Sequence, residues 1–192
     1  MSREKSPELE ILERSGALLN GHFELTSGRH SDRYFQCALA LQYPEFVQAL
    51  CCRITDEFAT EQINCVIAPA VGGIPVTQEV GRLLDIRSLF AERQDGAMTL
   101  RRGFKIEPGE RVLVVEDVVT TGGSVQEVVQ LVQEIGAEVV GVGAIVDRSN
   151  GTVDFGVPFF AAYCQEVITW PQVECPLCRK QQPVNKPGSR SL

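Results

Sequence analysis

Apolar positions along the chain follow two alternating spacings, which predict strands and helices in turn. Short, nearly continuous apolar runs at 65–68, 111–115 and 138–147 are typical of strands buried on both faces. Helical spacing covers 74–84 and 124–135 between them. This order of elements predicts an α/β fold, in which a parallel sheet is flanked by helices on both faces.

The N-terminal part of the chain has a different pattern. Helical spacing is found over 8–19 and 45–59, with Pro44 at a plausible helix start. Between them, 23–25 and 33–36 are predicted to be short strands around a turn, so this hairpin would form a small hood over the sheet.

Two segments are predicted to lack regular structure. Residues 94–104 are polar and contain Gly96 and Gly103, which favours a mobile loop after a strand at 87–92. Residues 179–192 contain two prolines, a glycine and four basic residues with no acid, which favours a disordered C-terminal tail. Residues 1–178 would then form a single domain.

Length and composition fit one globular domain of 192 residues, 44% of them hydrophobic. A net charge of -7 argues against a general nucleic-acid or membrane-surface binder. Residues 81–105 nevertheless carry six basic side chains against three acidic ones, which could attract a small anion. No apolar run is long enough to span a bilayer, and the N-terminus does not resemble a signal peptide.

The seven cysteines are odd in number and irregular in spacing, which favours free thiols in a reducing compartment, hence the cytoplasm. Cys175 and Cys178 form a Cys-x-x-Cys pair, which offers two metal ligands where structural zinc usually takes four. The chain's two histidines, His22 and His30, lie far away in the sequence. A tight turn with two free thiols is therefore the favoured interpretation, and no metal ligand is assigned.

The most informative stretch runs from Arg111 to Ser124. Its apolar strand ends at Glu116 and Asp117, and a turn rich in Thr and Gly leads into a helix. In open parallel sheets, ligands bind beyond the carboxyl ends of the strands. A helix N-terminus suits phosphate, whereas carboxylates accept hydrogen bonds from vicinal hydroxyls. Phosphate on the turn and a diol on the acids together describe a ribose 5-phosphate.

This stretch resembles the type I phosphoribosyltransferases, which combine an apolar strand, two acids and a Thr/Gly-rich turn. It lacks the lysine of a Walker A loop, and Gly141-Val142-Gly143 lacks the third glycine of a dinucleotide fingerprint. The alternative is a plain strand–turn–helix whose acids cap the helix. The resemblance implies a binding site for 5-phosphoribosyl 1-diphosphate made of Glu116, Asp117, Val118, Val119, Thr120, Thr121, Gly122, Gly123, Ser124, Gly72, Gly73 and Arg93.

Further stretches resemble orotate phosphoribosyltransferases in particular, namely 21–31, 69–75, the pair Asp147-Arg148 and the Cys-x-x-Cys ending. This resemblance implies Arg93 and Asp117 as catalytic residues. It implies that orotate contacts Thr120, Arg148, Tyr34 and Phe35. Better-known orotate enzymes have lysines where this chain has Thr26 and Gly72, and Arg101 and Arg102 are candidate replacements.

The implied reaction transfers ribose 5-phosphate to orotate and releases diphosphate, with Mg²⁺ held mainly by substrate oxygens. The resemblance also implies a homodimer, because in family members the mobile loop reaches the neighbouring subunit's site. Two alternatives stay open: transfer to a purine or to uracil, and a non-catalytic, ligand-sensing regulator of the same fold.

Overall fold

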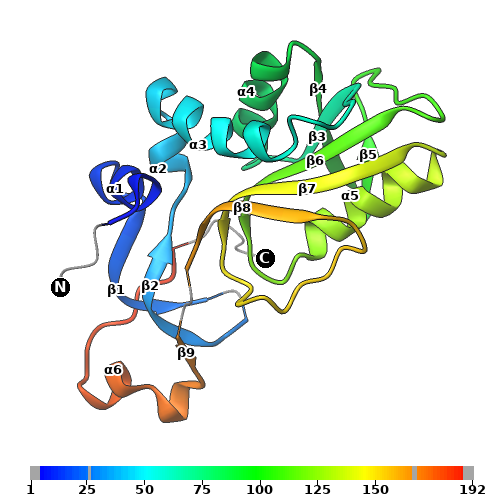
Figure 1. Ribbon diagram of the computed structural model, residues 1–192. Coiled ribbons are helices and arrows are strands. Elements are labelled where there is room, and N and C mark those ends of the chain that lie inside the picture. Colours follow the sequence, from blue (N-terminus) through cyan, green and yellow to red (C-terminus); the bar gives the residue numbers. More distant parts are fainter. Residues whose placement is uncertain (1–4, 26, 166–167, 188–192) are drawn as a thin grey trace.

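The computed structural model describes residues 5–25, 27–165 and 168–187, which form two sheets joined by helices (Figure 1). The helices are α1 (Pro7–Arg14), α2 (Ala38–Leu41), α3 (Pro44–Glu57), α4 (Ile74–Leu84), α5 (Gly123–Glu134), the 3₁₀ helix η1 (Gln172–Glu174) and α6 (Pro176–Arg179). The strands are β1 (Leu18–Glu24), β2 (His30–Phe35), β3 (Cys65–Pro69), β4 (Arg87–Gln94), β5 (Ala97–Leu100), β6 (Arg111–Val119), β7 (Glu138–Asp147), β8 (Phe159–Cys164) and β9 (Thr169–Trp170).

The larger sheet has six strands in the order β5-β4-β3-β6-β7-β8. All neighbours are parallel except β5, which runs antiparallel to β4. From β3 the chain crosses through α4 to β4 on one side, and β6 then lies on the other side of β3. The strand order therefore reverses between β3 and β6, where open α/β sheets form a ligand crevice. The predicted parallel α/β fold is confirmed.

Helices cover both faces of this sheet, and β3 shows why its sequence is apolar throughout. Val66 and Ala68 pack in one core with residues of α3 and α4. Cys65 and Ile67 face the opposite core, which contains the valines of α5. Successive residues of β3 are thus buried alternately against the two helical layers, as expected for a strand without a solvent-exposed face.

Two glycines in β7 explain how α3 packs so closely on the sheet. A Cβ atom at Gly141 would lie 2.3 Å from the ring of Phe58, and one at Gly143 would lie 2.4 Å from a methyl carbon of Ile54. The Gly-x-Gly pattern of this strand therefore serves helix–sheet packing, since both glycines lie inside β7 rather than in a loop.

The smaller sheet, which we call the hood, consists of β1, β2 and β9 in antiparallel order. The hairpin of β1 and β2 agrees with the predicted hood, although its strands are longer than predicted. The two-residue strand β9 joins it from the other end of the chain.

The C-terminal segment differs from the prediction of disorder as far as the structure describes it. The Asn185 N–H donates to the carbonyl of His22, and the Asn185 carbonyl accepts from the N–H of Glu24. Lys186 Nζ lies 2.7 Å from Glu24 Oε1. Asn185 therefore lies along β1, because its backbone groups pair with an exposed strand edge. The remainder of the predicted tail, 188–192, lies outside the described residues.

The predicted mobile loop at 94–104 contains a strand in the structure. Residues 97–100 form β5, which closes a tight hairpin on β4 with Asp95 and Gly96 at positive φ. Met98 is buried in the core on the α5 side, which ties this hairpin down. The polar composition of this segment led to the prediction of a loop, although Asp95-Gly96 is a preferred pair for a two-residue hairpin turn.

None of the seven cysteines, all of which the structure describes, forms a disulfide. The cytoplasmic location itself stays a prediction. Within the described part of the chain, no helix combines the length and apolar character needed to cross a bilayer.

Candidate active site

The turn between β6 and α5 forms a small cavity at the carboxyl edge of the sheet. Gly122 caps α5 in the left-handed conformation at φ 75°, and a Cβ atom there would lie 2.9 Å from the ring of Phe155. Only glycine fits such a position without strain. The cavity measures about 70 Å³ and is lined by Glu116 and residues 118–125. A water takes roughly 30 Å³ of liquid, so this space suits a small anion rather than a base.

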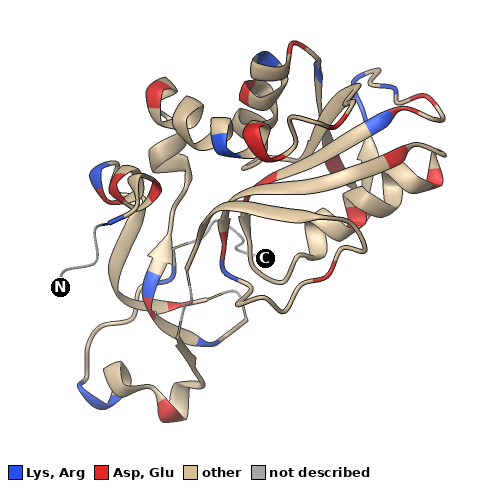
Figure 2. Ribbon diagram, viewed as in Figure 1, with Lys and Arg blue, Asp and Glu red and all other residues tan. Residues whose placement is uncertain are grey.

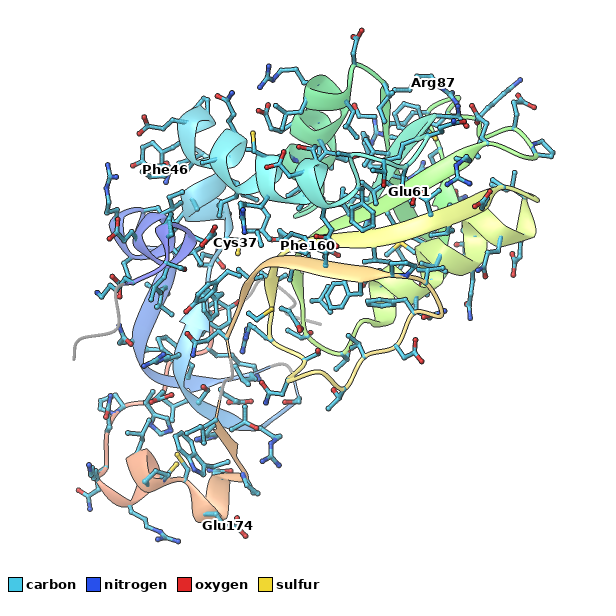
Figure 3. All side chains as sticks on the ribbon, in the orientation of Figure 1. Cys37, Phe46, Glu61, Arg87, Phe160 and Glu174 are labelled. Atoms are coloured by element: carbon cyan, nitrogen blue, oxygen red, sulfur yellow. The ribbon has the colours of Figure 1, made fainter. Side chains whose placement is uncertain are left out.

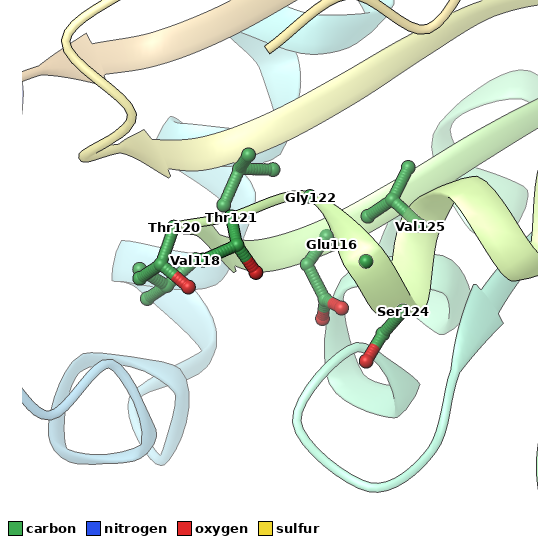
Figure 4. A pocket seen from close by; sticks show the side chains of 9 residues that line it. Glu116, Val118, Thr120, Thr121, Gly122, Ser124 and Val125 are labelled. Atoms are coloured by element: carbon green, nitrogen blue, oxygen red, sulfur yellow. The ribbon is translucent and has the colours of Figure 1, made fainter. Parts of the chain in front are cut away.

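The hydroxyl groups around this turn are arranged for an anion. Figure 4 shows the side chains of Thr120, Thr121 and Ser124 projecting from the same side of the turn. The start of α5 adds backbone N–H groups and the positive end of the helix dipole. The turn therefore has the donors that the phosphate of a ribose 5-phosphate requires.

The two acids differ in their surroundings. Glu116 is 8% exposed, and its Oε1 accepts a hydrogen bond of 3.0 Å from the N–H of Asp117. Asp117 is partly exposed, and its Oδ1 accepts from the N–H of Val118 at 2.9 Å. A side-chain hydrogen bond also links Glu116 to Asp117. Asp117 is thus the more accessible of the two acids, and it lines the larger cavity described below.

Burial, together with the negative charge of Asp117, raises the pKa of Glu116 well above its ordinary value of 4.5. A raised folded-state pKa means that the fold favours the protonated acid, so this stabilisation is complete below pH 4.5 and is lost as the pH rises through the raised pKa. We therefore expect Glu116→Gln to melt at a higher temperature than the wild type at pH 7. The difference should shrink toward pH 4.5, which thermal unfolding at several pH values would measure. A variant that melts lower at neutral pH would contradict this account.

The loop after β3 approaches the acids from the neighbouring strand, across the point where the strand order reverses. A Cβ atom at Gly72 would lie 2.7 Å from Asp117 Oδ2, and one at Gly73 would lie 2.9 Å from the Pro69 carbonyl oxygen and 2.6 Å from Ala68 Cβ. Gly72 therefore leaves room for the Asp117 carboxylate, whereas Gly73 leaves room for the backbone itself. The two sequence motifs meet as predicted.

These two glycines should respond differently to the same substitution. We expect Gly72→Ala to keep most of its stability, because the Asp117 carboxylate can rotate away, but to lose affinity for the diphosphate donor. Gly73→Ala should lower the melting temperature, because fixed backbone and Cβ atoms oppose it. Thermal unfolding and donor titration on both variants would test this. Donor affinity equal to that of the wild type in Gly72→Ala would refute the contact with Asp117.

A larger cavity of about 790 Å³ adjoins the small one and shares Val118, Thr120, Thr121 and Ser124 with it. One side is formed by the hood, through Tyr34 and Phe35. Drug-sized ligands occupy pockets of about 300–1,000 Å³, so a sugar phosphate with a base fits this space.

Arg148 lines this cavity and is the single Lys or Arg side chain among its described lining residues. It follows β7, and its backbone N–H donates to the carbonyl of Val119 at 2.9 Å, which places it level with Thr120. Its guanidinium carbon lies 5.9 Å from the ring centroid of Tyr34 and 5.8 Å from that of Phe35. Both are cation–π distances.

The charge of Arg148 is uncompensated among the described residues. Its Nε is buried without a hydrogen-bond partner, and no carboxylate of the described chain forms an ion pair with it. Asp147, its neighbour, accepts instead from the N–H of Ser149. Burial accordingly lowers the pKa of Arg148. A buried cation without a partner beside two aromatic rings suits a planar, anionic ligand.

Cys37 also lines the larger cavity, at the junction between the hood and the main sheet (Figure 3). Burial, reinforced by the negative charges of Asp117 and Glu116, raises the pKa of this thiol well above its ordinary value. Because the thiolate is the reactive form, Cys37 is not suited to be a nucleophile.

Most residues implicated from sequence line one of the two cavities. These are Tyr34, Phe35, Gly72, Glu116, Asp117, Val118, Val119, Thr120, Thr121, Gly122, Gly123, Ser124 and Arg148. Gly73 lies beneath them, next to Glu116. Thr26, where a family lysine is missing, lies outside the described residues.

Arg93 is the exception, because it lines neither cavity. It lies at the end of β4, and its guanidinium pairs with Glu127 of α5 at 2.8 Å. The expected basic patch is largely neutralised, since Arg82, Arg87 and Arg102 are also paired with glutamates. In particular, Arg102 binds both carboxylate oxygens of Glu92.

Several cavity residues were not anticipated from sequence. They are Leu25, Ser27, Gln36, Ala38, Asn150 and Thr169. Thr169 belongs to β9, and its hydroxyl accepts a hydrogen bond from Arg29 Nε at 2.8 Å. No local pattern in the sequence distinguishes these residues, because they come from separate loops and strand ends.

The comparison with known families agrees with this geometry. The model of the phosphoribosyl transferase domain matches residues 47–177. The chain therefore belongs to the phosphoribosyltransferase family, and the resemblance seen in its central motif is confirmed.

Within this family, highly similar relatives are orotate phosphoribosyltransferases. The one from Pelotomaculum thermopropionicum is 57% identical over 95% of this chain and 96% of its own length. The one from Desulforamulus reducens is 52% identical over the whole of both chains. Among solved structures, the orotate phosphoribosyltransferase of Aeropyrum pernix has a TM-score of 0.70 at 23% identity, covering 81% of this chain and 92% of its own. The adenine phosphoribosyltransferase of Rhodothermus marinus has a TM-score of 0.68 at 19% identity, covering 84% and 100%, so the fold alone does not separate acceptor bases.

Proposed function

We propose that this protein is an orotate phosphoribosyltransferase, which transfers ribose 5-phosphate from 5-phosphoribosyl 1-diphosphate to orotate and releases diphosphate. The observation that carries the choice of acceptor is Arg148, a half-buried side chain with a buried Nε and no acidic partner among the described residues, which lines the larger cavity beside Tyr34 and Phe35. Orotate is a planar ring with one carboxylate, so it supplies both the flat face and the missing negative charge.

Each of the three parts of the donor, the 5-phosphate, the ribose and the diphosphate, would bind a different part of the site. The 5-phosphate would occupy the small cavity of the turn, and the ribose hydroxyls would bind Asp117. The diphosphate would face the backbone of Gly72 and Gly73. The acceptor ring would then lie beside Arg148 and the hood, in line with the ribose carbon that loses diphosphate.

The groups in the site support a reaction without a covalent enzyme intermediate. As diphosphate leaves, negative charge builds on it and positive charge on the ribose. The Asp117 carboxylate would stabilise a ribose cation bound at the turn, and Cys37 stays a neutral thiol. Enclosure by the hood would exclude water and limit hydrolysis of the donor.

Mg²⁺ is the expected cofactor. The acidic side chains at the turn are two adjacent carboxylates, Glu116 and Asp117, and Mg²⁺ usually takes only one or two carboxylates from a protein when substrate phosphates supply the other oxygens. This fits an ion held chiefly by diphosphate and ribose oxygens, with Asp117 and water completing the hard oxygen ligands. When bound, Mg²⁺ would neutralise charge on the leaving diphosphate.

We infer that Arg93 acts from a second copy of the chain or after movement of its hairpin. The salt bridge with Glu127 is exposed on both sides, so it is weak and easily exchanged for diphosphate. In a homodimer, the β4–β5 hairpin of one subunit would reach the site of the other subunit. Arg93 would then have a role there that it does not have in the cavities of its own subunit.

Two other functions are less well supported. A purine or uracil acceptor would leave the Arg148 charge uncompensated. A nucleic-acid-binding regulator would need a basic surface, whereas Figure 2 shows acidic and basic residues interspersed over the ribbon, and the net charge is -7.

One experiment tests the proposal directly. The protein is incubated with the donor and Mg²⁺, together with orotate, uracil, adenine, guanine or hypoxanthine in separate reactions, and diphosphate release is measured. We expect release with orotate far above that with the other bases. Release with a purine or with uracil, but not with orotate, would show that this other base is the acceptor. No release with any base would favour a non-catalytic, ligand-sensing regulator.

A further inference from the structure

Four side chains that bind metals meet on the hood, away from the cavities described above. His22 comes from β1, His30 from β2, and Cys175 and Cys178 from the segment that begins α6. One ligand atom from each lies within 4.8 Å of all the others. His22, His30 and Cys175 are buried and Cys178 is partly buried. In Figure 3 the label of Glu174, the residue before Cys175, marks this end of the molecule, far from Arg87.

The distances between these atoms approach those of a tetrahedral site. Zinc binds sulfur at about 2.3 Å and histidine nitrogen at about 2.0–2.1 Å, so neighbouring ligand atoms should be roughly 3.3–3.8 Å apart. The sulfur–nitrogen distances are 3.4 Å from Cys175 to His22 Nε2, 3.7 Å from Cys178 to His22 Nε2 and 3.3 Å from Cys178 to His30 Nδ1. The two nitrogens are 2.8 Å apart and would separate by about half an ångström around an ion.

The other nitrogen of His22 is already oriented for this role. Its Nδ1 lies 2.8 Å from the backbone carbonyl oxygen of Gln182, which can only accept a hydrogen bond. Nδ1 therefore carries the proton, and the neutral ring presents the lone pair of Nε2 to the cluster. Such a carbonyl partner is typical of metal-binding histidines, because it fixes both the tautomer and the ring orientation.

A cluster held by hydrogen bonds alone explains less. A proton on His30 Nδ1 could be donated to His22 Nε2, and this bond would satisfy both nitrogens. It would leave no reason for two thiols, which are weak hydrogen-bonding groups, to converge on the same two nitrogens. One ion at the centre accounts for all four side chains.

We propose that His22, His30, Cys175 and Cys178 bind one Zn²⁺ ion in a closed, structural site. Two thiolates and two imidazoles in a tetrahedral arrangement are a preferred zinc ligand set, whereas Mg²⁺ and Ca²⁺ take oxygen ligands. All four positions are filled by protein groups, so no position is open for a substrate. The expectation of two unliganded thiols rested on the distance of the histidines in sequence, which the fold removes.

The ion would join two parts of the chain that are far apart in sequence, the hairpin that carries His22 and His30 and the segment that carries Cys175 and Cys178. It would fasten β1 and β2 to the C-terminal segment that contains α6. The strand β9 precedes this segment in the chain and neighbours β2 in the sheet. The same hood supplies Tyr34, Phe35 and Thr169 to the larger cavity. Zinc would thus hold the wall against which the acceptor base binds, without touching the base.

Metal content tests the proposal without reference to activity. The untagged protein is produced with zinc in the medium and purified under reducing conditions without chelators, and its metals are measured by mass spectrometry. We expect about one zinc ion per chain, since four ligands form one site. The double variant Cys175→Ser/Cys178→Ser should contain almost none, whereas Cys164→Ser, which changes the exposed thiol at the end of β8, should keep it.

A second measurement on the wild type avoids the risk that a variant misfolds. X-ray absorption at the zinc edge should show two sulfur and two nitrogen neighbours, at about 2.3 Å and 2.0–2.1 Å. Wild-type protein without zinc, zinc retained by the double variant, or a shell without sulfur would each overturn the proposal. Diphosphate release with orotate is a separate measurement, so either proposal can fail while the other stands.

Discussion

Arg148→Ala is expected to weaken orotate binding by roughly 2–5 kcal/mol, the usual cost when one partner of a buried charge pair is removed. This corresponds to a loss of about thirty-fold to several thousand-fold in affinity. The reason is that Arg148 is half-buried, with its Nε fully buried, and has no acidic partner among the described residues, so the orotate carboxylate would be its counter-charge. Donor binding should change little, because residues 116–124 are intact.

Two titrations on the variant, one with orotate and one with 5-phosphoribosyl 1-diphosphate, measure this difference. Arg82→Ala is a matched control, since Arg82 is exposed on α4 and paired with Glu79. Equal losses for both ligands in Arg148→Ala would mean that this residue supports the whole site and does not recognise the base.

Asp117→Asn is expected to weaken donor binding and to lower turnover while the protein remains folded. The substitution removes a charged acceptor at the place where the ribose diol would bind, and hydrogen bonds to charged groups contribute roughly 1.5–3 kcal/mol. That is about a ten- to hundred-fold loss of affinity. Glu116→Gln should have an effect of the same kind, although its carboxyl group is more deeply buried.

The control for both variants is Asp56→Asn, which removes one exposed carboxylate on α3. Donor affinity is measured by calorimetry, turnover by diphosphate release, and folding by thermal unfolding. If both acid variants bind and turn over the donor like the wild type, the assignment of these acids to the ribose is wrong.

The main sheet and the turn after β6 could be predicted from the sequence because the signals are local. Val112 to Val115 form an unbroken apolar run, and the acids, the turn and the valines of α5 follow within twenty residues. In β7 the alternation of valine and glycine also indicated a buried strand. The structure adds the reason for its glycines, which is the close approach of α3.

The hood could be predicted only in part, because its contacts join distant residues. His22 and Cys175 are 153 residues apart, and the strand β9 is too short to show any periodicity. The position of Arg93 was also beyond sequence reasoning, since its partner Glu127 lies on another element. A polar segment could equally be a loop or, as at 97–100, an edge strand with one buried methionine.

In the hood, β2 pairs with β9 and β1 pairs with the segment at Asn185. This pairing has a consequence for the order of folding. The parallel strands of the main sheet lie between residues 65 and 164, and successive β-α-β units can form as the chain leaves the ribosome. The hairpin of β1 and β2 is synthesised before this sheet, whereas β9 and the strand-like segment at Asn185 are synthesised after it. Long-range pairing is slow because loop closure must precede it. We therefore expect the hairpin of β1 and β2 to reach its final structure after the main sheet, although it is translated earlier, and the acceptor side of the cavity to form after the phosphate-binding turn.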